Sequence, residues 1–176
     1  IEYISLIIVI ILIMKLIKLL NLIILIIISW VGFGQNKVRV KLKINLIPVE
    51  QRNGHLKNCQ VKIFRNSVES QNYTIEKSKI KKTISTRGIY KFEFSKNSYV
   101  SKYIIIDAVD IPPNRKKHHL KADITLFHYS KQDDVQFLKK EPISIAYYDY
   151  VNKKMRWDFE YYRGVVEKII KAQISK

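Results

Sequence analysis

The feature that most constrains the fold is a strict alternation of apolar and polar side chains over residues 38–46. The apolar members are Val38, Val40, Leu42, Ile44 and Leu46, and the residues between them are Arg39, Lys41, Lys43 and Asn45. Successive side chains of a strand point to opposite faces of a sheet, so this pattern predicts a strand with one face in a core and the other in water. The fold must therefore contain a sheet with one covered face.

Further short strands follow, with turn signals between them. Pro48 ends the first strand, and Asn53-Gly54 is typical of a tight turn. We expect strands over residues 59–65, 73–76, 80–84, 89–94, 99–107 and 122–129. Short strands without a long helical period predict an all-β protein, with a β-sandwich domain over residues 36–130.

The last third of the chain, residues 131–176, predicts an extension of a different kind. Residues 143–150 and 155–159 form an expected hairpin joined through residues 151–154. Asp158 is a plausible N-cap, and a helical period follows it. The apolar residues at that period are Phe159, Tyr162, Val166, Ile169 and Ile170. They predict a short amphipathic helix packed on the sandwich, with a membrane-binding helix as the alternative.

The N-terminal segment has the layout of an export signal. From Met14, two lysines precede an apolar run over residues 19–28, and Gly32 and Gly34 stand before Gln35. This predicts a signal peptide cleaved between Gly34 and Gln35, with residues 1–13 upstream of a true start at Met14. The alternative is a retained anchor over about residues 16–33, which is long enough to cross a bilayer.

Three stretches of the domain resemble a known family. Residues 54–66 read GHLKNCQVKIFRN, residues 86–94 read TRGIYKFEF, and residues 98–102 read SYVSK. They are similar to the strand motifs of carboxypeptidase regulatory-like domains of the secreted Bacteroidetes type, over roughly residues 38–129. The first strand lacks the usual glycine, and Ser98 replaces the glycine before Tyr99. The resemblance implies a seven-stranded prealbumin-like (transthyretin-like) sandwich, a periplasmic or outer-membrane setting, and no catalytic residue.

The chain carries a formal net charge of +17. Such a surface attracts phospholipid or lipopolysaccharide head groups, acidic polysaccharide and nucleic acid, although a lysine-rich composition also accompanies AT-rich genomes. The densest positive run is expected in a loop after Pro112-Pro113 and consists of Arg115, Lys116, Lys117, His118 and His119. It predicts either a contact with phosphate or carboxylate groups or a solvated basic surface. A metal site at the two histidines is disfavoured, because nearby cations repel a metal ion.

A second candidate surface lies in the C-terminal hairpin, where aromatic and cationic residues alternate. Amphipathic rings beside cations suit carbohydrate or peptide recognition and also base stacking. We expect Tyr147, Trp157 and Tyr162 to be part of the core. An exposed binding role is open for Tyr148, Tyr150, Lys153, Lys154 and Arg156.

The sequence holds none of the common catalytic signatures, such as a P-loop or a zinc-protease motif. The single cysteine, Cys59, predicts a small buried side chain, since one thiol makes neither an internal disulfide nor a thiolate metal site. We therefore expect a non-catalytic, exported binding or structural module of the cell envelope, without cofactor or metal, that contacts an envelope protein or an anionic envelope polymer or lipid. The alternatives are a nucleic-acid-binding protein, which export disfavours, and an enzyme with an unrecognised site.

Overall fold

The computed structural model describes residues 14–21, 37–48, 56–113, 117–128 and 135–174. The chain divides into two compact units, residues 1–37 and 38–176. In the first unit, residues 14–21 are helical. Among the described residues, no helix combines the length and the apolar character that crossing a membrane requires. The expected cleavage position between Gly34 and Gln35 lies outside the described residues.

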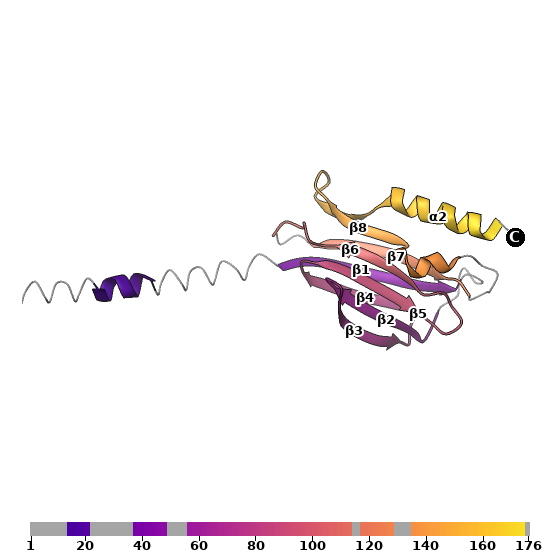
Figure 1. Cartoon of the computed structure of the whole chain (residues 1–176), viewed down its shortest axis with the longest axis horizontal. Coiled ribbons are helices and arrows are strands. Elements are labelled where there is room, and N and C mark those ends of the chain that lie inside the picture. The colour runs from indigo at the N-terminus through magenta and orange to yellow at the C-terminus, as the bar shows by residue number, and fades with distance from the viewer. Residues whose placement is uncertain (1–13, 22–36, 49–55, 114–116, 129–134, 175–176) are drawn as a thin grey trace, which may run out of the picture. The chain divides into compact units, whose positions relative to one another are not determined.

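The second unit is built mainly of strands in two sheets, which confirms the expected all-β sandwich with a C-terminal helix (Figure 1). The smaller sheet has the order β4-β1-β7, and the larger one β3-β2-β5-β6-β8-β9. The elements are β1 (Lys37–Pro48), β2 (Cys59–Arg65), β3 (Val68–Ile75), β4 (Lys79–Thr86), β5 (Ile89–Ser95), β6 (Lys102–Asp107), β7 (His118–Leu126), η1 (Val135–Lys139), β8 (Ser144–Asp149), β9 (Lys154–Trp157) and α2 (Phe159–Ile174).

Turn geometry explains where the strand boundaries differ from expectation. Asn66 and Ser67 have φ of 49° and 69° and join β2 to β3 in a two-residue turn, so β3 begins at Val68. Both central residues of a type I′ turn need positive φ, which Asn tolerates well. Ser98 has φ of 66°, a conformation that favours glycine, and β6 begins only at Lys102.

The expected loop over residues 115–119 is wrong for its last two members. His118 and His119 open β7, which pairs in parallel with β1 from Val40↔His118 onward. A run of charged and polar residues predicts a loop, but pairing with β1 extends strand β7 into this run. Their side chains lie on opposite faces, since His118 is buried and His119 is exposed.

The C-terminal hairpin is part of the larger sheet. β8 pairs in parallel with β6 over Ile104↔Ser144 to Ile106↔Ala146, and β9 pairs with β8 in antiparallel fashion. Ala146, Tyr148 and Met155 consequently join the main hydrophobic core.

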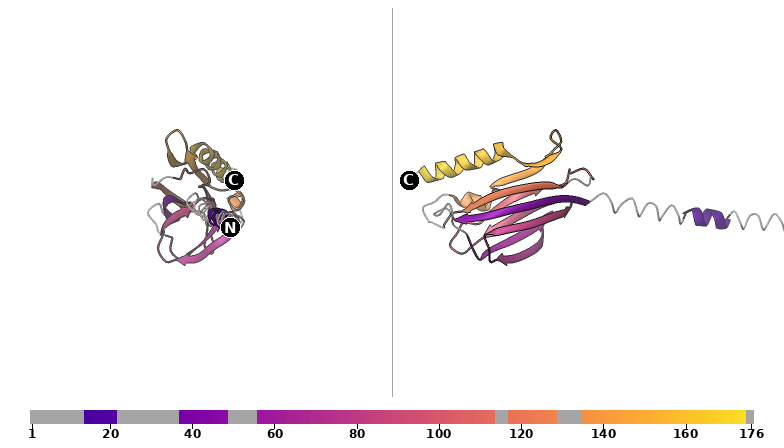
Figure 2. Two further views of the ribbon diagram at one scale, coloured as in Figure 1. Left: turned by 90° about the vertical axis from the view of Figure 1, so that its left-hand side faces the viewer. Right: turned by 180° about the vertical axis from the view of Figure 1, so that it is seen from behind.

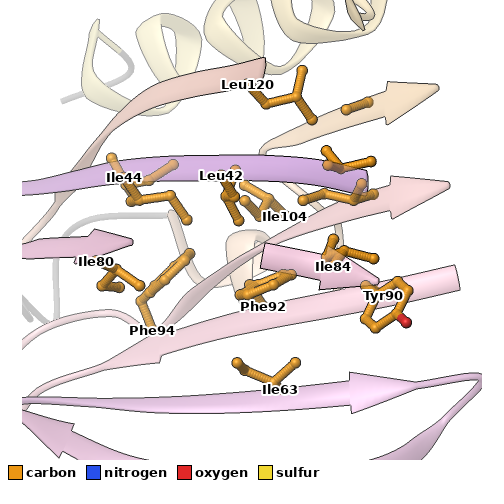
Figure 3. Packing of buried hydrophobic residues seen from close by; sticks show 14 of the residues in the cluster. Leu42, Ile44, Ile63, Ile80, Ile84, Tyr90, Phe92, Phe94, Ile104 and Leu120 are labelled. Atoms are coloured by element: carbon orange, nitrogen blue, oxygen red, sulfur yellow. The ribbon is translucent and has the colours of Figure 1, made fainter. Parts of the chain in front are cut away.

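The core lies between the two sheets and draws on the alternation of β1. Figure 3 shows Leu42 and Ile44 of β1 facing the rings of Phe92 and Phe94 of β5, with Ile104 of β6 beside them. All five side chains are buried. Burial of each such side chain stabilises the fold by roughly 1.5–3 kcal/mol. β1 runs along most of the length of this unit (Figure 2), so its buried residues from Val38 to Leu46 contribute to the core along that whole length.

Helix α2 begins as expected, because the Oδ1 of Asp158 accepts a hydrogen bond of 3.0 Å from the backbone N–H of Tyr161. The helix contacts β8, and its buried residue Val165 packs in a second cluster with Val100, Val135 and Leu138. This confirms a helix packed on the sandwich.

The expected apolar face of α2 is wrong in part. Phe159, Tyr162 and Ile170 are exposed by 62%, 45% and 47%. The packed residues are Tyr161, Val165, Ile169 and Ala172. Apolar residues occur on two adjacent stripes of this helix, so periodicity alone left open which stripe is covered.

The two glycines Gly88 and Gly164 occupy opposite environments. Gly88 has φ of +145°, and a Cβ there would lie 2.9 Å from the Oδ1 of Asn66. That oxygen accepts a 2.9 Å hydrogen bond from the backbone N–H of Ile89. A Cβ at Gly164 would meet nothing within 4 Å.

We predict opposite effects of alanine at these two positions. Gly88→Ala should destabilise the chain by about 1–3 kcal/mol, because it combines backbone strain with a clash against a hydrogen-bonded oxygen. Gly164→Ala should stabilise it by up to about 1 kcal/mol through helix propensity. Urea unfolding of the two variants measures both effects. Equal stability of both variants would contradict the geometry at Gly88.

Candidate functional site

The outer face of the smaller sheet is strongly basic. The side chains of β1, β4 and β7 that alternate with buried ones point outward and are exposed. We call this surface the basic face and define it by Arg39, Lys41, Lys43, Lys79, Lys81, His119 and Lys121. Of the described outward residues on these strands, Asp123 is the one that carries a carboxylate.

Strand pairing places these basic side chains side by side. In the parallel register of β1 and β7, Lys41 lies opposite His119, and Lys43 opposite Lys121. A hollow of about 350 Å³ runs over this point and is also lined by Lys81 of β4. Like charges opposite one another on a sheet repel. An anion placed between them is attracted by both and relieves that repulsion.

A second, smaller hollow continues from the first along the sheet. It measures about 210 Å³ and is lined by Lys43, Asn45, Lys121, Ala122 and Asp123. The amide nitrogen of Asn45 donates a 2.5 Å hydrogen bond to the Oδ1 of Asp123, across the β1–β7 pair. A carboxylate and an amide are thus held together at the end of the basic face.

The third hollow is an aromatic pocket, defined by Trp157 at the end of β9 and Phe159 and Tyr162 at the start of α2. It measures about 240 Å³ and shares Lys121, Ala122 and Asp123 with the second hollow. The indole Nε1 of Trp157 donates a 2.8 Å hydrogen bond to the carbonyl oxygen of Lys121. This bond ties β9 of the larger sheet to β7, an outer strand of the smaller one, and places the rings beside the basic face.

The basic run expected at residues 115–119 is divided by the structure. Arg115 and Lys116 lie outside the described residues, and Lys117 is exposed. His119 belongs to the basic face. His118 is only 3% exposed, and its ring meets the ring of Tyr148 edge-on, with 5.6 Å between centroids.

The expected exposed role of Tyr148 is wrong. Its ring is only 7% exposed, because position 148 of β8 points into the core. Tyr150, Lys153 and Lys154 are exposed at the tip of the hairpin, as expected. Tyr162, expected in the core, is exposed and lines the aromatic pocket.

The remaining candidate of the hairpin, Arg156, takes part in the turn itself. Its Nη1 lies 3.1 Å from the Oδ2 of Asp149. Asp149 also accepts bonds from the backbone N–H groups of Val151 and Asn152 and from the side chain of Asn152. The hydrogen bonds from Asn152, supported by Arg156, lower the pKa of the carboxyl to about 2. Arg156 and Asp149 therefore act in forming the hairpin.

Cys59 is fully buried on β2, which confirms the expectation for this residue. Its burial raises the pKa of the thiol above the ordinary value, while Lys96 acts in the opposite direction. Within the described parts of the chain, no group of three or more histidine, cysteine or acidic side chains is arranged to hold a metal ion.

Sequence reasoning missed the basic face. The signal was present in β1, where the outward positions over residues 39–43 are all cationic. A solvated strand face usually mixes charges of both signs. That β4 and β7 would flank β1 and add Lys81 and Lys121 depends on sheet order, which no local pattern contains.

Lys102 at the start of β6 points into the core and is 2% exposed. Its Nζ donates a 2.5 Å hydrogen bond to the carbonyl oxygen of Thr125 and lies 3.7 Å from the ring centroid of Phe127. Burial away from water lowers the pKa of this amine to about 7. Its contacts make it part of the packing between β6 and β7.

The chain matches no family model and none of the curated proteins. Among solved structures, it is similar to the Bacillus anthracis TIE protein, with a TM-score of 0.41 and 18% identity over 52% of this chain and 18% of that one. It is also similar to 3-chlorocatechol 1,2-dioxygenase from Rhodococcus opacus 1CP, with a TM-score of 0.34 and 8% identity over 54% and 61%. The chain thus spans less than two thirds of either protein, and likenesses at these TM-scores carry no inference about function.

We predict that Lys102 makes stability depend on pH. Between pH 7 and 10.5 the unfolded chain holds a proton on this amine that the folded chain has released, so folding becomes more favourable as pH rises. From pH 7 to pH 9, the free energy of unfolding of the wild type should rise by about 2 kcal/mol relative to Lys102→Met. Urea unfolding of both chains at several pH values measures the difference. A constant difference across this range would contradict the low pKa.

Proposed function

We propose that the chain is an exported, non-catalytic binding module of the cell envelope that holds an anionic polymer on the basic face. The observation that carries the proposal is the register of β1 and β7, which sets Lys41 beside His119 and Lys43 beside Lys121. Cations from three adjacent strands line one continuous hollow there.

The spacing of these charges suits a polymer more than a small anion. Outward residues along one strand stand about 7 Å apart, and neighbouring strands stand about 4.8 Å apart. The basic face is therefore a grid of single charges without the buried, convergent donors of a small-molecule site. A chain with repeated negative groups contacts many points of such a grid at once, and each contact releases counterions.

The cell-envelope setting rests on the sequence. Lysines followed by an apolar run and small residues before Gln35 favour export, and envelopes contain acidic polysaccharides and lipopolysaccharide. We assign strands β1–β7 to the prealbumin-like module of the carboxypeptidase regulatory-like family, in line with the motifs over residues 54–66 and 86–94. The expected location is the periplasm or the outer membrane, or the inner membrane if the leader is retained.

We predict that removing three charges from the basic face weakens binding to a polyanion. In the variant Lys41→Gln, Lys43→Gln, Lys121→Gln, the slope of log affinity against log salt for polyphosphate should become shallower by roughly 2–3. Titration of the full-length chain in a non-ionic detergent, at several salt concentrations, measures this slope.

The matched control changes three exposed lysines elsewhere, Lys57, Lys77 and Lys140, to glutamine. It has the same net charge as the first variant, so a general effect of charge would act on both alike. Equal slopes for the two variants would refute the basic face as the binding surface. Binding of duplex DNA much more tightly than polyphosphate of equal charge would replace the envelope proposal by a nucleic-acid one.

Export has its own test. We predict that the protein isolated from cells begins at Gln35, as read by mass spectrometry of its N-terminal peptide. A protein that retains residues 14–34 would show instead that the leader is an anchor.

A further inference from the structure

The aromatic pocket is the feature of the surface that a charge-binding role leaves unexplained. Phe159 is 62% exposed and Tyr162 is 45% exposed, and both line the same pocket as Trp157. Exposing two large rings at a helix start leaves apolar area in water that a ligand could cover.

The pocket is connected to the basic face through shared residues. Lys43 and Lys121 line both the hollow over the basic face and the next one, and Lys121 and Asp123 line both that one and the aromatic pocket. A single elongated ligand can therefore pass from the cations of β1 and β7 to the rings at β9 and α2.

The polar groups at the mouth of the pocket narrow the choice of ligand. The carboxylate of Asp123 accepts a hydrogen bond from the amide of Asn45, and both groups lie beside Lys121. A carboxylate next to an amide offers adjacent acceptors and donors, which suit neighbouring hydroxyl groups. Aromatic rings present apolar faces on which the C–H side of a sugar ring can pack.

We propose that the aromatic pocket holds a sugar ring of an acidic polysaccharide whose charged groups lie on the basic face. The proposal rests on the proposed function and names the class of its polymer. Charge complementarity supports it, because the lysines of the basic face would meet the acidic groups, while Asp123, which would repel them, stands at the pocket mouth, where hydroxyl groups would lie. A polymer of phosphate alone has neither the hydroxyl groups nor the apolar face.

The experiment compares three probes on the full-length chain in non-ionic detergent. Oligogalacturonate carries sugar rings and charge, its methyl ester carries the rings without the charge, and polyphosphate of equal charge carries no ring. The wild type should bind oligogalacturonate more tightly than polyphosphate and far more tightly than the ester.

The variant Phe159→Ala, Tyr162→Ala removes two exposed rings without touching the core. It should lower affinity for oligogalacturonate about tenfold and leave affinity for polyphosphate unchanged. Asp123→Asn should weaken oligogalacturonate binding and slightly strengthen polyphosphate binding, since it removes a negative charge. Tyr150→Ala, an exposed aromatic at the hairpin tip, is the matched control and should change neither affinity.

The outcomes separate the two proposals. If the double variant binds oligogalacturonate as the wild type does, the sugar site is refuted while the basic face stands. If the wild type binds neither anionic probe better than the Lys41, Lys43, Lys121 variant does, the proposed function itself fails. If the wild type is a dimer in sedimentation and the double variant a monomer, a second copy of the chain occupies the pocket, and the sugar site is refuted.

Discussion

The burial of one side of β1 between the two sheets is the interaction on which the rest of the structure depends. β1 is the central strand of the smaller sheet, and its inward residues from Val38 to Leu46 are all buried. A slip of one residue would place Lys41 and Lys43 in the core, where an unpaired charge is very unfavourable. The register of the strand is thus fixed by its apolar half, and its polar half is positioned as a consequence.

That link between the two halves explains how a cluster of like charges persists. Repulsion between Lys43 and Lys121 opposes folding, but each pair is exposed and partly screened by water and salt. The buried apolar side chains on the inner face of β1 contribute more stabilising free energy per residue than the repulsion between exposed charges costs. The fold therefore remains stable despite the repulsion within the basic face, because the other side of β1 is well packed in the core.

Sequence patterns predicted the local structure well where they had a single interpretation. The alternation over residues 38–46, the expected strand over residues 89–94 and the cap at Asp158 all identify their elements. Patterns failed where tertiary packing decides, as for the covered stripe of α2 and the burial of Tyr148. Ser98 adopts a positive φ of 66°, a conformation that favours glycine, and no sequence pattern marks a serine for it.

The candidate site was the least predictable part because it is assembled from separate segments. Arg39 to Lys43 are visible as a basic stretch, but Lys81 and Lys121 join them only through the order β4-β1-β7. Likewise, Trp157 and Tyr162 line one pocket with Asp123 because β9 packs against β7 and α2 follows β9, an arrangement that periodicity does not encode.

The parallel pairing of β1 and β7 has a mechanical consequence. Their ladder runs from Val40↔His118 to Pro48↔Leu126, with Lys41, Lys43 and Lys121 along it. If β1 and β7 are pulled in opposite directions along their length, the ladder is loaded in shear, so its hydrogen bonds share the force and do not break one after another. The two strands that carry most of the basic face are thus joined in a way that resists sliding of one strand past the other.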